Sequence, residues 1–221
     1  MKRWLAAAGV LTLLGLPGRA HAWGPEGHEA IGALAESLLS EAARKALREL
    51  LGEDRHLSDF EICVWADTVR KELKNGTWHY VDIPYDKEAY DKERDSREGA
   101  NVIERIEHFM QVLKDKQAAQ DERVKALKYL VHLVADLHQP LHCIERDNDA
   151  GGNKVMVTMP SATEASNLHK VWDFDFVKLN LEKTAPTTYG EKTLKDRAEK
   201  LSAEERKKIE AGSVADWALE A

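Results

Sequence analysis

The chain has 221 residues, of which 43% are hydrophobic and 32% charged, and 39 acidic residues against 32 basic ones give a formal net charge of −7. This length suits one well-filled core, so we expect a single domain. The acidic balance excludes a protein that holds nucleic acid through a broad basic surface, so a phosphate ligand would need local positive charge. The two cysteines, Cys63 and Cys143, are too few for a disulfide framework. They could form one bond in an exported protein, or remain two buried thiols.

The N-terminus has the pattern of a secretion signal. The charged pair Lys2-Arg3 precedes an apolar run over 5–16, and Ala20-His21-Ala22 is a small-residue cleavage site. The apolar run is too short for a stable membrane span, and an uncleaved anchor is the alternative. We expect residues 1–22 to be removed, which leaves a secreted or periplasmic protein that starts at Trp23 and has no membrane anchor.

Most of the remaining chain, 23–221, shows the apolar spacing of three and four residues that is typical of helices. Only 78–83 and 154–159 have strand character, and each is short enough for a small hairpin. The charge-dense segment 85–97 predicts a solvated loop or an exposed helix. The predicted helices cover residues 26–40, 41–51, 58–74, 99–115, 121–138, 163–179, 191–200 and 203–211. We therefore expect one all-α, mainly helical domain with at most a small β-hairpin.

The segment from His132 to His142 (HLVADLHQPLH) carries the strongest functional signal. His132 and Asp136 stand four residues apart on a predicted helix, so their side chains leave the same face. Pro140 ends or bends that helix, and His142 follows on the turn. Two imidazoles and a carboxylate that converge at a helix end suit zinc. His138 lies about 200° around the helix from Asp136, so we expect it to point away.

Three further candidate ligands lie in the first third of the chain, and each has an alternative role. His28 starts the first predicted helix and could be an ordinary first-turn residue. Asp67 could form a structural ion pair with Arg70. His79 lies in an aromatic segment and could form a hydrogen bond within the core. Such groups are costly to bury unless they are paired or bind metal, so each addition favours the metal hypothesis.

A second His-x-x-x-Asp pair, His169 and Asp173, repeats the spacing of the first on another predicted helix. Without metal it would be an ordinary pair of helix neighbours. We expect His56 and His108 at the surface. Imidazoles and carboxylates without thiolates suit Zn²⁺ better than an iron–sulfur cluster or an all-oxygen calcium site. The candidates exceed the four ligands of one zinc and predict a cluster: His28, Asp67, His79, His132, Asp136, His142, His169 and Asp173.

Six short motifs in this order resemble the S1/P1 family of single-strand-specific zinc nucleases, which belongs to a larger superfamily with zinc phospholipase C. The resemblance covers nearly all of residues 23–221. The motifs are Trp23-Gly24-x-x-Gly27-His28, Trp65-Ala66-Asp67, Trp78-His79-Tyr80, His132-x-x-x-Asp136-x-His138-Gln139-Pro140-Leu141-His142, Gly151-Gly152-Asn153 and Asn167-Leu168-His169-x-x-Trp172-Asp173.

This resemblance implies three zinc ions in a mainly helical fold. The first would be held by Asp67, His79, His132 and Asp136, and the second by His142, His169 and Asp173. The third would be held by the α-amine and carbonyl oxygen of Trp23 together with His28 and Asp136, so that signal cleavage creates a metal ligand. Asp67 would also be catalytic, orienting or deprotonating the attacking water.

The implied reaction is hydrolysis of single-stranded DNA and RNA by a monomeric endonuclease that leaves 5′-phosphate ends, with 3′-nucleotidase activity on nucleotides as a further expectation. Two other functions stay open. One is a phospholipase C-like phosphodiesterase, although that branch tends to have Glu at the position of Asp173. The other is a truncated, inactive zinc-binding protein, because the family's late helix normally continues beyond Ala215–Ala221.

Overall fold

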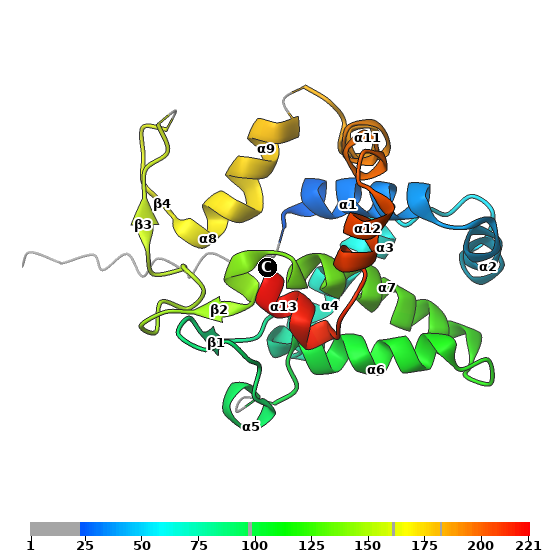
Figure 1. The fold of residues 1–221 in the computed structure, drawn as a ribbon, viewed down its shortest axis with the longest axis horizontal. Coiled ribbons are helices and arrows are strands. Elements are labelled where there is room, and N and C mark those ends of the chain that lie inside the picture. The colour runs from blue at the N-terminus through cyan, green and yellow to red at the C-terminus, as the bar shows by residue number, and fades with distance from the viewer. Residues whose placement is uncertain (1–22, 97–98, 161, 182) are drawn as a thin grey trace, which may run out of the picture.

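The computed structural model describes residues 23–96, 99–160, 162–181 and 183–221, and the predicted signal sequence over 1–22 lies outside them. Helices make up most of this part of the chain, as expected (Figure 1). None of the helices within the described ranges is long and apolar enough to cross a membrane. The α-helices of seven or more residues are α1 (Pro25–Leu38), α2 (Glu41–Leu51), α4 (Trp65–Leu73), α6 (Val102–Lys114), α7 (Gln120–Leu137), α12 (Ala203–Ile209) and α13 (Val214–Glu220).

Shorter helical segments link these helices and carry several of the candidate ligands. The short α-helices are α3 (Phe60–Cys63), α5 (Lys92–Asp95), α8 (Leu168–Lys170), α9 (Phe176–Leu181), α10 (Pro186–Thr188) and α11 (Lys195–Glu199). Two 3₁₀ turns, η1 (Gly76–His79) and η2 (Pro140–His142), and two π-type segments, η3 (Val171–Asp175) and η4 (Tyr189–Leu194), complete the helical elements.

The main hydrophobic core lies around the paired helices α6 and α7, which run side by side (Figure 1). Ile106 of α6 and Tyr129 and Leu133 of α7 are fully buried in it. Each such side chain contributes about 1.5–3 kcal/mol of transfer free energy to folding. Helix α13 adds Val214 and Ala218 to the same cluster. This core fixes α7, the helix that carries the central motif.

The ends of α6 and α7 follow from local sequence. Asn101 caps α6: its side chain accepts hydrogen bonds from Ile103 and Glu104, and Glu104 bonds back to the Asn101 backbone. Such a reciprocal cap contributes about 1 kcal/mol. Helix α7 ends at Leu137, shortly before Pro140, which has no N–H with which to continue it. The chain therefore turns at the residue range that holds the candidate ligand His142.

The strands form two small sheets at one side of the molecule (Figure 1). Strand β1 (Ile83–Pro84) pairs in parallel with β2 (Ile144–Glu145). Strand β3 (Met156–Val157) pairs antiparallel with β4 (Ser166–Asn167), which is the small hairpin predicted near 154–159. The first pairing ties the segment after η1 to the segment after η2.

Three predicted elements need correction. The predicted strand over 78–83 is wrong for most of its length, because Trp78 packs on Phe109 and Tyr129 from a 3₁₀ turn. This tertiary packing overrides the strand preference of an aromatic segment. The predicted helix over 58–74 is broken at Val64 into α3 and α4. The predicted helix over 163–179 begins only at Leu168, where Asn167 caps it.

The other boundaries are close to prediction. Helices α1, α2, α6, α7 and α12 match the predicted helices to within a few residues, as boundaries from sequence normally do. The helix predicted over 191–200 starts earlier, at Pro186, and runs through η4 into α11. The charged segment 85–97 contains helix α5 in its described part, and this helix is partly exposed, with Lys92 and Glu93 at the surface.

Candidate metal centre

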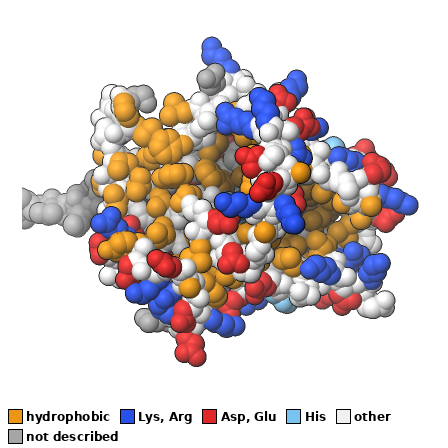
Figure 2. Space-filling model, in the orientation of Figure 1, with side chains coloured by type: hydrophobic (Ala, Val, Ile, Leu, Met, Phe, Trp, Pro, Cys, Tyr) orange, Lys and Arg blue, Asp and Glu red, His pale blue; other side chains and the backbone are white. Residues whose placement is uncertain are grey.

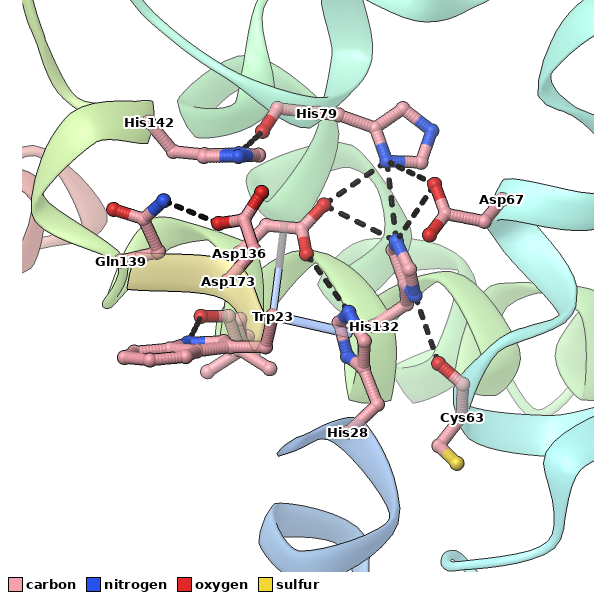
Figure 3. Close-up of polar contacts among 12 residues, drawn as sticks. Trp23, His28, Cys63, Asp67, His79, His132, Asp136, Gln139, His142 and Asp173 are labelled. Atoms are coloured by element: carbon pink, nitrogen blue, oxygen red, sulfur yellow. Dashed lines mark hydrogen bonds and ion pairs between the residues drawn. The ribbon is translucent and has the colours of Figure 1, made fainter. Parts of the chain in front are cut away.

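The eight candidate ligands come from seven different elements and lie in neighbouring groups. Figure 3 labels all of them except His169. Helix α7 supplies two of them, and helices α1, α4 and α8, the turns η1 and η2 and the segment η3 supply one each. Their donor atoms form three groups, each compact enough for a metal ion. The first is Asp67, His79 and His132, the second is His28, His132 and Asp136, and the third is His142, His169 and Asp173.

The first group surrounds one point between α4, η1 and α7. His79 Nδ1 lies 3.1 Å from His132 Nε2 and 2.9 Å from Asp136 Oδ2. Asp67 Oδ1 lies 3.7 Å from His79 Nδ1 and 3.6 Å from His132 Nε2. Ligands at zinc–nitrogen distances on a tetrahedron are separated by about 3.3 Å, so this spacing suits a zinc ion.

Asp136 joins this group to a second position beside α1. Its other oxygen, Oδ1, lies 3.3 Å from His28 Nε2. The His28 and His132 rings are stacked with centroids 4.1 Å apart. Trp23 lies beside this position: its indole donates to Ala135 O at 2.9 Å (Figure 3). The two oxygens of Asp136 therefore face two different sets of donors.

The third group lies between η2 and the α8–η3 segment. His142 Nε2 and His169 Nε2 are 3.0 Å apart, and Asp173 Oδ2 lies 3.4 Å from His169 Nε2. The backbone also holds this segment near the N-terminal residues, since Gly24 N donates to Asp173 O at 2.8 Å. Phe174 packs its ring against Gly24, where a larger residue would collide with it.

Backbone carbonyl groups fix the orientation of three of the imidazoles. His132 Nδ1 lies 2.7 Å from Cys63 O, and His142 Nδ1 lies 2.7 Å from His79 O. His169 Nδ1 lies 2.7 Å from Gly151 O. A carbonyl oxygen can only accept, so each Nδ1 carries the proton, and in the neutral ring Nε2 has its lone pair toward the cluster.

Gly151 is required where it stands for this arrangement. Its φ of +56° lies in the left-handed region, and a Cβ there would collide with the carbonyl oxygen of Leu141. The close approach places the Gly151 carbonyl within hydrogen-bond distance of His169 Nδ1. Gly151 of the sequence motif thus serves to orient His169, a candidate ligand.

Burial keeps most of these imidazoles neutral. It lowers the pKa of His28 to about 3 and that of His142 to about 4. Burial also lowers the pKa of His79 and His169. Neutral imidazole is the form that binds metal, so the low pKa values favour ligation.

Three further groups have shifted pKa values: Asp173, mainly because of burial, and His132 and Asp136, because each charge stabilises the other. Burial raises the pKa of the Asp173 carboxyl to about 8. Burial opposes charge on His132 too, but the Asp136 carboxylate outweighs it and raises the pKa of His132 to about 9. His132 in turn holds the pKa of Asp136 well below its usual range despite burial. Without metal, His132 and Asp136 thus form a buried ion pair.

The donor set fits zinc. In the described structure, both nitrogens of His28, Oδ1 of Asp136 and Oδ2 of Asp173 are buried without a hydrogen bond. Such groups cost about 1–3 kcal/mol each when left unsatisfied. Two neutral imidazoles whose Nε2 lone pairs face each other at 3.0 Å also repel unless a cation lies between them. The imidazole and carboxylate donors and their spacing are those that zinc prefers.

A family model described as S1/P1 Nuclease matches residues 23–221. The chain belongs to the S1/P1 nuclease family. It is 34% identical to Endonuclease 2 of Arabidopsis thaliana over 169 residues, which are 72% of this chain and 57% of that protein. It is 30% identical to Nuclease S1 of Aspergillus oryzae over 159 residues, 69% of this chain and 54% of that protein. Nuclease P1 of Penicillium citrinum is 30% identical over 158 residues, 68% of this chain and 57% of that protein.

This S1/P1 family chain therefore spans little more than half the length of the curated relatives it matches. The mainly helical fold agrees with the fold predicted from the motifs. The motifs themselves contribute most of the residues of the centre, including the Gly151 carbonyl. Family membership and the geometry thus point to the same part of the molecule.

Other residues also behave as the sequence predicts. His138 points away from the centre, and its Nδ1 lies 2.7 Å from Val134 O. His56 and His108 are exposed. Cys63 and Cys143 are buried free thiols, the alternative to a disulfide. Arg70 lies 4.0 Å from Asp67, so their ion pair exists beside the centre rather than in place of it.

Sequence reasoning missed the groups that hold the ligands. Gln139 is fully buried and donates to Asp173 Oδ1 at 2.6 Å (Figure 3). The carbonyls of Cys63 and His79 also escaped prediction, because a backbone acceptor leaves no trace in residue identity. Gln139 had a usable signal, since it stands inside the central motif between His138 and Pro140.

Proposed function

We propose that this protein is an exported, zinc-dependent endonuclease that hydrolyses single-stranded DNA and RNA and leaves 5′-phosphate ends. The observation that carries the proposal is the buried set of imidazole and carboxylate side chains, whose ligand atoms lie in three compact groups with the spacing of metal ligands. Family membership supports the reaction class, because the relatives are named as nucleases.

The three donor groups would hold three zinc ions. Asp67, His79, His132 and Asp136 Oδ2 would hold the first, and His142, His169 and Asp173 Oδ2 the second. His28 and Asp136 Oδ1 would hold the third together with the α-amine and carbonyl oxygen of Trp23. When bound, zinc supplies positive charge for the phosphate oxygens and lowers the pKa of an attacking water.

Asp67 is the residue that we assign to proton transfer. Its side chain is 5% exposed and lies at the edge of the first group, within 4.0 Å of the Arg70 guanidinium. That guanidinium stabilises the ionised carboxylate, which can accept a proton from water and orient it. Arg70, whose side chain is 24% exposed, also places a positive charge beside the site.

The surface supports a local site rather than a broad basic one. On the face drawn in Figure 2, basic and acidic side chains alternate over the helical half of the molecule. A face with mixed charges does not bind a nucleic acid strand by electrostatic attraction along the length of the strand. Phosphate binding would then depend on the centre, which a flexible single strand can reach more readily than a stiff duplex.

Export would complete the third zinc position. A peptide nitrogen has no lone pair to donate, whereas the free amine of Trp23 has one, so cleavage after Ala22 would create a ligand. We propose that the processed protein acts as a monomer in the periplasm or outside the cell.

The experiment is cleavage of end-labelled oligonucleotides by zinc-loaded protein that starts at Trp23. We expect cleavage of single-stranded DNA and RNA, products with 5′-phosphate ends, weak cleavage of the matched duplex and complete loss of activity in EDTA. Zinc-loaded protein that leaves both single strands intact would overturn the proposal. Release of phosphocholine from vesicles by such protein would instead favour the phospholipase C-like alternative.

A further inference from the structure

Gln139 is a fully buried polar residue outside the three donor groups. It lies between the end of α7 and Pro140, with 0% of its surface exposed. Its side-chain amide makes two short hydrogen bonds: Nε2 donates to Asp173 Oδ1 at 2.6 Å, and Oε1 accepts from Leu141 N at 2.6 Å. A backbone N–H can only donate, so the oxygen must face Leu141 and the NH₂ must face Asp173.

The contact with Asp173 determines which carboxylate oxygen is left for a metal. Oδ1 is taken by the Gln139 amide, whereas Oδ2 lies 3.4 Å from His169 Nε2 and has no hydrogen bond within the described structure. Rotation of the carboxylate would break the 2.6 Å bond. The amide therefore holds Oδ2 toward the two imidazoles.

The contact with Leu141 acts on the opposite side of the same group. Leu141 is the middle residue of η2, the turn that carries His142. One amide thus ties the turn that bears His142 to the segment that bears Asp173, two ligands that lie far apart in the chain (Figure 3). Within the described structure, its two hydrogen bonds reach neither His28 nor the Asp67 group.

We propose that Gln139 is a positioning residue that sets the zinc affinity of the His142–His169–Asp173 group by fixing the Asp173 carboxylate. This inference rests on the proposed function for zinc binding but not for the nuclease reaction. The competing explanation is that Gln139 only caps the turn through Leu141. The two roles use different atoms of the amide and can be separated.

Gln139→Glu separates them. Glutamate keeps an oxygen to accept from Leu141 N, but it replaces the NH₂ donor with a second oxygen that faces Asp173 Oδ1. We expect zinc affinity at one position to fall about 10- to 100-fold, as for other residues that orient metal ligands. In a titration with a chromophoric chelator, the variant should release about one zinc equivalent at a lower chelator concentration than wild type does. The remaining zinc of the variant should stay bound at that concentration.

Asn101→Asp is the matched control, because it also converts a buried amide to a carboxylate. Asn101 is 3% exposed, caps α6 with its oxygen, and donates through Nδ2 to Tyr90 and Ser96. We expect this variant to lose thermal stability but to keep all its zinc. His169→Ala identifies the position: combining it with Gln139→Glu should release no further zinc.

Gln139→Met, which lacks both donor and acceptor, should lose the same zinc equivalent. Retention of all zinc by Gln139→Glu, or simultaneous loss of every zinc, would overturn the inference and leave a purely structural role. Wild-type protein that binds no zinc would overturn both this inference and the proposed function. Zinc-loaded wild type without nuclease activity would overturn only the proposed function.

Discussion

Two adjoining interiors share helix α7 and differ in how their polar groups are satisfied. On the core side, Tyr129 stacks on Phe109 with ring centroids 4.4 Å apart, and its hydroxyl accepts a hydrogen bond from Asn75 at 2.8 Å. On the other side, His132 and Asp136 form a buried ion pair that faces further imidazole and carboxylate groups. Within the described residues, the first interior is mostly apolar and aromatic, although Asn75 Oδ1 is buried there without a hydrogen bond. The second interior concentrates imidazoles and carboxylates that a bound cation would satisfy.

This difference shows why the chain tolerates so many buried titratable groups. Unpaired charges and polar atoms destabilise a core by several kcal/mol. The apolar core around α6 and α7 compensates for that cost and holds the helices in place. The predictions below separate the contribution of the core from that of the metal centre.

Removal of zinc should have the largest effect. A ligand present at about 1,000 times its Kd stabilises the folded state by about 4 kcal/mol per site. We therefore expect EDTA to abolish nuclease activity and to lower the Tm by roughly 10 °C or more. Calorimetry with and without EDTA, followed by zinc readdition, measures this. An unchanged Tm would mean that the second interior does not depend on metal.

Substitutions of two neighbouring residues on α7 should have separate effects, one on zinc content and the other on unfolding free energy. His132→Ala removes a donor shared by two groups, and we expect activity to fall on the order of 100-fold or more because zinc is lost. Leu133→Ala should cost about 2–5 kcal/mol of unfolding free energy but leave zinc content near wild type. Zinc analysis and urea unfolding of both variants check this. Equal zinc loss in the two would contradict the separation.

Gly151→Ala should have a smaller effect confined to the centre. The added methyl group collides with Leu141 O and displaces the carbonyl that orients His169, so we expect zinc affinity to fall about 10-fold. Gly52→Ala is the control, since Gly52 also has a positive φ of +101° but nothing within 4 Å of the new methyl group. It should lose stability without losing zinc.

The last prediction concerns the pH dependence of the metal-free protein. The pKa of His142 is about 4 in the folded state, below its usual value of 6.5. Between pH 6.5 and pH 4 the unfolded chain binds a proton at His142 and the folded protein does not. The stability of the folded state is therefore unaffected by His142 above pH 6.5 and falls as the pH is lowered toward 4. Between pH 7 and pH 5 in EDTA, wild type should lose about 2 kcal/mol more stability than His142→Gln. Parallel curves for the two proteins would contradict the buried neutral imidazole.

Much of the centre was predictable because metal ligands must be specific residue types. The pairs His132–Asp136 and His169–Asp173 are four apart and end on one helix face, so spacing alone places them. The mainly helical fold was also predictable, because the apolar residues recur at the three- and four-residue spacing of a helix. The break at Val64 and the turn that carries His79 were not predictable, since both depend on packing between distant segments.

The hydrogen bonds that orient the candidate ligands could not be predicted from the sequence. The carbonyls that orient His132, His142 and His169 are backbone atoms, and every residue has one. The link from Gln139 to Asp173 joins positions 34 residues apart. These contacts depend on the complete fold, whereas the ligands depend on local spacing.

The most direct test of the account is an anomalous difference map recorded at the zinc edge on crystals of zinc-loaded protein that begins at Trp23. We expect three peaks: one among Asp67, His79 and His132, one between His142 and His169, and one beside His28 and Asp136. A map without peaks at these buried donors would contradict the account, since their convergence would then have another cause.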